Sequence, residues 1–130
     1  MSENTEYKRS AGARGEGHVE YQGETLPVLL TNRAIAEAEK ATGKTMVQLA
    51  RTSDIGIGDV VHLLRAGLEY GRRDANLRRK VYSVDETYDI MDELGFTTCA
   101  KVVVSAMADV IAYRSENAGP PVTARSETLP

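Results

Sequence analysis

The chain has 130 residues, a mass of 14.2 kDa and a formal net charge of −3. This is the length of one ordinary domain, and the acidic balance argues against a protein that binds mainly by attraction to phosphates. Six Tyr, one Phe and no Trp leave a core that must be aliphatic. The single Cys99 excludes an internal disulfide and a thiolate-rich zinc site. No apolar stretch approaches the ~18 residues of a membrane span.

Both ends of the chain are polar and rich in small residues. Such segments bury too little apolar surface to offset the entropy cost of ordering them. We therefore predict disordered tails at 1–15 and 118–130, which flank one folded domain at 16–117. The first 17 residues lack the apolar segment of a secretory signal, so we expect a cytoplasmic protein.

The first predicted element is a β-hairpin over residues 17–31. Residues 18–21 alternate between polar and apolar side chains, and a turn containing Gly23 follows. The next strand repeats apolar residues at period two: Leu26, Val28 and Leu30. Pro27 removes a backbone donor, which favours a strand at the edge of a sheet.

Two helices are expected next. The first begins after Thr31 or Asn32, either of which can cap it, and ends at Gly43. Its apolar face contains small residues, among them Ala34 and Ala38. The second is short, from about 45 to 51, and should bury Met46, Leu49 and Ala50.

A third helix is predicted over about 58–72, with cations at its C-terminal end. Its apolar stripe consists of Ile57, Val60, Val61, Leu64 and Leu68. Its polar residues are expected to face water: Asp59, His62, Arg65 and Glu69.

The sequence from Ser83 to Glu86 is typical of a capping box and predicts a fourth helix that ends at Leu94. All its carboxylates lie on one side: Asp85, Glu86, Asp89, Asp92 and Glu93. Thr97 or Thr98 is expected to cap a fifth helix that runs to about Glu116. The predicted fold is therefore mainly α within an α+β class, with a small N-terminal hairpin packed on about five helices.

The fifth helix is unusually apolar. Placed at about 100° per residue, its apolar side chains fill a sector of roughly 200°, whereas an ordinary surface helix has a stripe about 100° wide. The sector contains Cys99, Ala100, Val102, Val103, Val104, Ala106, Met107, Val110, Ile111 and Tyr113. Val103 and Val110 lie at its centre and should belong to the core. Ala100, Val104 and Ile111 are expected to meet a partner, with Asp85, Asp89 and Asp92 as a further candidate surface.

Motifs with catalytic content are incomplete. Gly43-Lys44-Thr45 lacks the preceding strand and first glycine of a P-loop, which favours a helix end followed by a new helix. His18 and His62 have no partner at metal-ligand spacing. Cys99 falls on an apolar face, where a buried structural thiol is expected. We therefore expect a protein that is not an enzyme and has no catalytic residues, cofactor or metal.

One local cluster of cations lies between the third and fourth helices. It contains Arg72, Arg73, Arg78, Arg79 and Lys80. Because it lies in a connection and lacks interleaved aromatics, ordinary solvation or pairing with the acidic fourth helix is expected rather than binding of nucleic acid.

The order of these elements resembles the small tail assembly chaperones of long-tailed phages and gene transfer agents. The resemblance covers about 17–117 and rests on structural motifs. The motifs are the hairpin at 17–23, the helix end at 36–43, the segment 47–50, the Leu-Leu-Arg-Ala-Gly-Leu helix at 59–68, and the Ser83–Glu86 and Leu94–Phe96 segments. The connection at 72–82 is longer than the pattern leads us to expect.

The resemblance implies a non-enzymatic assembly factor. It would bind the tape measure protein in the host cytoplasm, keep it soluble during tail assembly, and be absent from the mature particle. A frameshifted longer form of the chain and self-association are further expectations, and no membrane partner is expected. Two alternatives stay open: a structural tail or head-completion subunit retained in the virion, and a small helical DNA-binding regulator.

Overall fold

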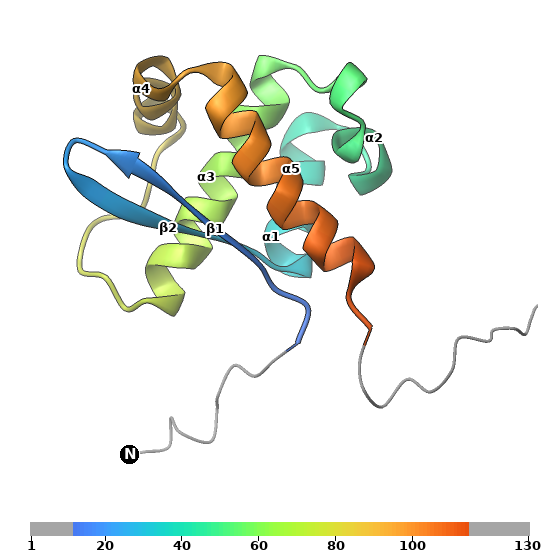
Figure 1. Cartoon of the computed structure of the whole chain (residues 1–130), viewed down its shortest axis with the longest axis horizontal. Coiled ribbons are helices and arrows are strands. Elements are labelled where there is room, and N and C mark those ends of the chain that lie inside the picture. The colour runs from blue at the N-terminus through green and yellow to red at the C-terminus, as the bar shows by residue number, and fades with distance from the viewer. Residues whose placement is uncertain (1–11, 115–130) are drawn as a thin grey trace, which may run out of the picture.

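The computed structural model describes residues 12–114, in which an antiparallel hairpin is followed by five α-helices (Figure 1). The elements are β1 (Gly15–Tyr21), β2 (Glu24–Leu30), α1 (Asn32–Thr42), α2 (Met46–Ala50), α3 (Ile57–Asp74), α4 (Val84–Leu94) and α5 (Phe96–Ala112). A 3₁₀ turn at Thr52–Asp54 connects α2 to α3. The predicted fold class is confirmed.

The hairpin turn contains two residues in the left-handed backbone conformation. Gln22 and Gly23 have φ values of 52° and 81°, the geometry that matches the twist of paired strands. The register places Val19 opposite Leu26 and His18 opposite Pro27. With two strands, both are edge strands, so the expectation for Pro27 is met.

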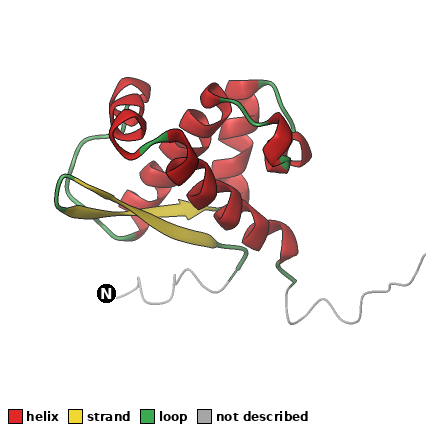
Figure 2. Cartoon of the chain, turned by 45° about the horizontal axis from the view of Figure 1, so that its top comes forward, coloured by secondary structure: helices red, strands yellow, loops and turns green. Residues whose placement is uncertain are grey.

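The hairpin lies across α3 and α5 rather than standing alone (Figure 2). β2 packs mainly on α3, and β1 packs mainly on α5. β1 begins at Gly15, which the predicted boundary placed in the tail. The folded part of the chain therefore begins before the predicted boundary: Gly15 is buried, and a Cβ there would lie 1.8 Å from the Ala106 carbonyl oxygen. Ala13 also packs against the core, and Arg14 pairs with Asp74 at 2.8 Å. The rest of the predicted N-terminal tail, 1–11, and the predicted C-terminal tail, 118–130, lie outside the described residues.

Local caps set the helix ends. Thr31 caps α1 by accepting a hydrogen bond from the Ala34 N–H at 3.1 Å, and Gly43 ends the helix at φ 76°. Thr45 and Gln48 form a reciprocal capping box on α2. Both predicted boundaries are confirmed.

The cap of α5 differs from the prediction. The helix begins at Phe96, directly after Gly95, whose φ is 94°. Thr97 and Thr98 therefore lie inside the first turn and are exposed, so the expected threonine cap is wrong. α5 ends at Ala112, before the predicted end. The short sharp connection at Gly95 leaves α4 and α5 bent by 113°.

α3 is the central helix and is buried on nearly every side. Its buried apolar residues are Val60, Val61, Leu63, Leu64, Ala66 and Leu68. Ile57, predicted to be in the stripe, is 58% exposed because it lies in the first turn, at the edge of the core. Asp59 and Glu69 were expected to face water, and both are buried. Packing from the hairpin, α1, α4 and α5 covers faces of α3 that a surface helix would expose.

Gly71 permits the close approach of β2 to α3. A Cβ at this position would lie 2.3 Å from the Pro27 carbonyl oxygen, closer than any van der Waals contact allows. We expect Gly71→Ala to destabilise the fold by about 1–3 kcal/mol, since the hairpin must move away from the helix. Thermal melting measures this loss, and Gly58→Ala is the matched control because nothing lies near its added Cβ. Equal melting temperatures for the two variants would contradict the packing.

Candidate partner-binding groove

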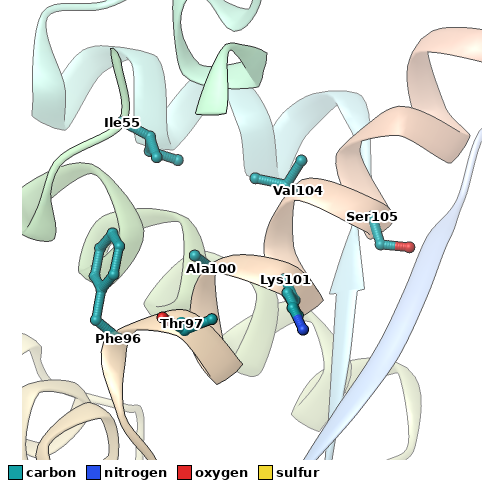
Figure 3. A pocket seen from close by; sticks show the side chains of 7 residues that line it. All are labelled: Ile55, Phe96, Thr97, Ala100, Lys101, Val104 and Ser105. Atoms are coloured by element: carbon teal, nitrogen blue, oxygen red, sulfur yellow. The ribbon is translucent and has the colours of Figure 1, made fainter. Parts of the chain in front are cut away.

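An apolar groove of about 490 Å³ runs beside the first three turns of α5 (Figure 3). Its lining residues are Ile55, Phe96, Thr97, Ala100, Lys101, Val104 and Ser105. Ile55 projects from the turn before α3 and faces the apolar edge of α5. Phe96 is 37% exposed at one end of the groove. The floor is apolar, and Thr97, Lys101 and Ser105 supply the polar side.

Two of the predicted partner-binding residues, Ala100 and Val104, lie in this groove and are half-buried. Ile111 lies two turns further along α5, outside the lining, and is 48% exposed. Val103 and Val110 are buried, as predicted for the centre of the sector. The division of α5 into a core side and an accessible edge therefore agrees with the helical periodicity.

The predicted acidic residues do not share this groove. Asp85, Asp89 and Asp92 are exposed on α4. The Tyr21 hydroxyl, near the hairpin turn, has its pKa raised by burial and then by the negative charges of Glu93 and Asp89. The acidic surface of α4 therefore lies close enough to the hairpin to influence it electrostatically. Ala100 and Val104 thus form one candidate surface, and the α4 carboxylates form another.

Ile55 and Phe96 were not among the predicted binding residues. Ile55 lies in a glycine-rich turn, and an apolar residue there is the signal that could have identified it. Phe96 directly follows a helix-breaking glycine. No periodic stripe places Ile55 beside α5, because the connection between α2 and α3 decides its position. The turn at Gly95 decides the position of Phe96, the first residue of α5.

The Gly-Lys-Thr segment forms the expected helix end and not a phosphate loop. The Lys44 ammonium lies 2.7 Å from Asp59 Oδ2 and also donates to the Asp54 carbonyl. Asp59 also accepts from the Gly56 N–H at 2.8 Å. Burial would raise the pKa of Asp59, but the hydrogen bonds from Lys44 and Gly56 outweigh it and hold the pKa below its ordinary value. This lysine therefore fastens the end of α1 to the start of α3.

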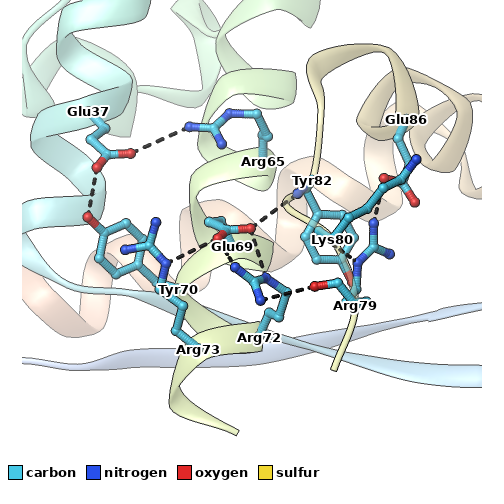
Figure 4. Close-up of polar contacts among 10 residues, drawn as sticks. All are labelled: Glu37, Arg65, Glu69, Tyr70, Arg72, Arg73, Arg79, Lys80, Tyr82 and Glu86. Atoms are coloured by element: carbon cyan, nitrogen blue, oxygen red, sulfur yellow. Dashed lines mark hydrogen bonds and ion pairs between the residues drawn. The ribbon is translucent and has the colours of Figure 1, made fainter. Parts of the chain in front are cut away.

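Glu69 is the centre of a second buried polar cluster (Figure 4). Its carboxylate accepts hydrogen bonds from the Arg72 guanidinium, from Arg73 Nε at 3.1 Å and from the Tyr82 N–H at 3.1 Å. The hydrogen bonds from Arg72 contribute most to lowering the pKa of Glu69, which falls to about 2. Glu69 is buried because residues 75–83 fold back over the end of α3, which periodicity along α3 does not reveal.

The basic cluster is largely neutralised within the chain. Arg72 and Arg73 pair with Glu69, while Arg79 lies 2.6 Å from Glu86 Oε1 on α4 and 3.6 Å from the Tyr82 ring centroid. The predicted pairing with the fourth helix is therefore confirmed for Arg79. Arg78 and Lys80 form no ion pair with any residue between 12 and 114.

Cys99 is fully buried, as predicted, and burial raises the pKa of its thiol. The described part of the chain contains no group of three or more His, Cys, Asp or Glu residues that could hold a metal ion. Among residues 12–114, no single helix has the length and hydropathy to cross a membrane, although α4 and α5 meet both criteria as a bent pair.

Comparisons with known proteins gave no match. The chain matches no protein-family model, no curated protein and no solved structure.

Proposed function

We propose that the protein is a phage tail assembly chaperone that binds the tape measure protein and keeps it soluble until the tail tube assembles. The observation that carries the proposal is the apolar groove on α5, lined by Ile55, Phe96, Ala100 and Val104. Residues 17–117 resemble this family, and the resemblance suggests the tape measure protein as the client that binds in the groove.

The chemistry of a tape measure client suits such a groove. A long amphipathic helix exposes an apolar stripe that aggregates in water unless another surface covers it. A groove with an apolar floor can accept side chains spaced three and four residues apart on such a helix. The acidic side of α4 would remain in water and keep the complex in solution.

The client should bind along α5 from the groove toward Ile111. Val104→Asp and Ile111→Asp are each expected to weaken binding of the tape measure protein by about tenfold or more, about 1.4 kcal/mol. Val81→Asp is the matched control, because Val81 is 57% exposed in the connection between α3 and α4, outside the groove. Co-purification and calorimetric titration with the tape measure protein measure the effect.

Undiminished binding by both α5 variants would place the client elsewhere. The next surface to test is then α4, by replacing Asp85, Asp89 and Asp92 together with asparagine. A protein inventory of purified particles separates the chaperone from a structural subunit, since a chaperone should be missing from the finished particle. Detection of this chain in stoichiometric amount in the particle would contradict the proposal.

A further inference from the structure

One edge of the hairpin presents a row of outward-pointing backbone groups. Residues that lie opposite each other in an antiparallel pair alternate between hydrogen-bonded and non-hydrogen-bonded positions. Pro27 lies opposite His18 and has no N–H to donate, so this is a non-hydrogen-bonded pair. By the alternation, Glu16 and Glu20 occupy non-hydrogen-bonded positions too. The N–H and C=O groups of Glu16, His18 and Glu20 therefore point away from β2, and we call this row the β1 edge.

The two edges of the hairpin have different surroundings. β2 lies against α3, where a Cβ on Gly71 would lie 2.3 Å from the Pro27 carbonyl oxygen. α5 covers the inner face of β1 and not its edge, since a Cβ on Gly17, which would point into that face, would lie 3.2 Å from Val102 Cγ1. Within residues 12–114, no backbone–backbone hydrogen bond joins the β1 edge to any element other than β2. The β1 edge is therefore the one that can accept a further strand.

A hollow of about 370 Å³ lies beside the β1 edge. Its lining residues are Glu16, Gly17, His18, Lys101, Val102 and Ser105. Lys101 and Ser105 also line the client groove, and they form the ridge between the two. In Figure 3, β1 passes on the far side of Ser105 from Ile55, which lines only the groove. The β1 edge and the client groove are thus separate surfaces on two flanks of α5.

The side chains of the β1 edge carry negative charge. Glu16, His18 and Glu20 are 63%, 62% and 64% exposed. Arg14 pairs with Glu16 but also with Asp74, so its single positive charge does not neutralise both carboxylates. β1 contains neither proline nor lysine, which natural proteins place on edge strands to prevent unwanted pairing. Its two glutamates repel the same edge of a second copy and favour a strand of opposite charge.

We propose that the β1 edge binds an extended, basic segment of a partner protein as a third, antiparallel strand. Backbone hydrogen bonds to the β1 edge supply the affinity, and alternate side chains supply the specificity. Lys or Arg residues four positions apart lie opposite Glu16 and Glu20, with Cβ atoms about 5 Å apart. The residues on the other face of the added strand are apolar, because they meet Val102 beside the hollow. This inference does not rest on the proposed function.

A synthetic peptide tests the proposal without the tape measure protein, so its failure is distinguishable from failure of the proposed function. The probe is acetyl-Thr-Lys-Val-Thr-Val-Lys-Thr-amide, titrated into the isotope-labelled full chain and followed by NMR. Binding should slow hydrogen exchange at the amides of the β1 edge by about tenfold or more. N-methylation of the central threonine should abolish binding, because its N–H faces β1. N-methylation of the valine before it is the matched control, since that N–H faces away.

Charge reversal tests the recognition. Glu16→Lys combined with Glu20→Lys should weaken peptide binding by about tenfold or more, and a peptide with glutamate in place of both lysines should prefer this variant. Asp85→Lys combined with Asp92→Lys is the matched control, because it makes the same change of net charge at exposed positions on α4. Circular dichroism confirms that each variant is folded.

Three outcomes would overturn the proposal. One is a peptide that shifts no resonance of β1, and another is equal binding by the two charge variants. The third is protection of the β1-edge amides in the full chain before any peptide is added. Loss of that protection on removal of residues 1–11 would identify the chain's own N-terminal segment as the occupant, and loss on dilution would identify a second copy.

Discussion

Val103→Asp is expected to prevent folding. Val103 is fully buried on the core side of α5, where no cation lies within the packed apolar cluster to pair with a new carboxylate. Burying such a group without a partner costs several kcal/mol, and a domain of this size has only about 5–15 kcal/mol of stability in total. Circular dichroism should show loss of the helical signal or a melting temperature lowered by tens of degrees.

Ile111→Asp is the matched control for this experiment. It introduces the same charge on the same helix, but its side chain is 48% exposed and the carboxylate can remain hydrated. We expect this variant to melt within a few degrees of the wild type. If the two variants melt alike, α5 is a core helix on both sides, and Ile111 cannot belong to a free surface.

Glu69→Ala is the second substitution with a large expected effect. It removes the acceptor for Arg72 and Arg73 and leaves the buried Tyr82 N–H without its partner. Removing one member of a buried ionic cluster typically costs about 3–5 kcal/mol. Glu37→Ala is the control, because Glu37 is 42% exposed and its contacts with Arg65 and Tyr70 lie near the surface. An exposed pair contributes about 1 kcal/mol or less.

The low pKa of Glu69 also predicts how stability depends on pH. The pKa falls from 4.5 to about 2 on folding, so the unfolded chain binds more protons between these values. The contribution of Glu69 is therefore complete above about pH 4.5 and is lost as the pH falls to 2, amounting to roughly 3 kcal/mol. Denaturant titrations should show this slope in the wild type and a smaller slope in Glu69→Gln. An unchanged slope would contradict the native pairing of Glu69.

Much of the local structure could be predicted because local interactions determine it. Thr31, Ser83 and Gly43 set helix ends through contacts within one turn, and alternation in 18–30 identified the hairpin. The core side of α5 followed from its period, since Val103 and Val110 project from the same side of any helix. Ala100 and Val104 were placed at the accessible edge by the same reasoning.

The burial of charged residues and the lining of the groove depend on long-range packing, so only the tertiary structure decided them. The helical periodicity of α3 places Asp59 and Glu69 on its polar face. In the folded chain, however, Lys44, which follows α1, pairs with Asp59, and the connection at 75–83 covers Glu69. Ile55 and Phe96 complete the groove because the chain turns at Ile55 and again at Gly95. The sequence by itself thus determined the elements, the caps of α1, α2 and α4, and the inner face of α5. Only the packed chain decided which charges are buried and which apolar residues share a groove, because both depend on contacts between segments far apart in sequence.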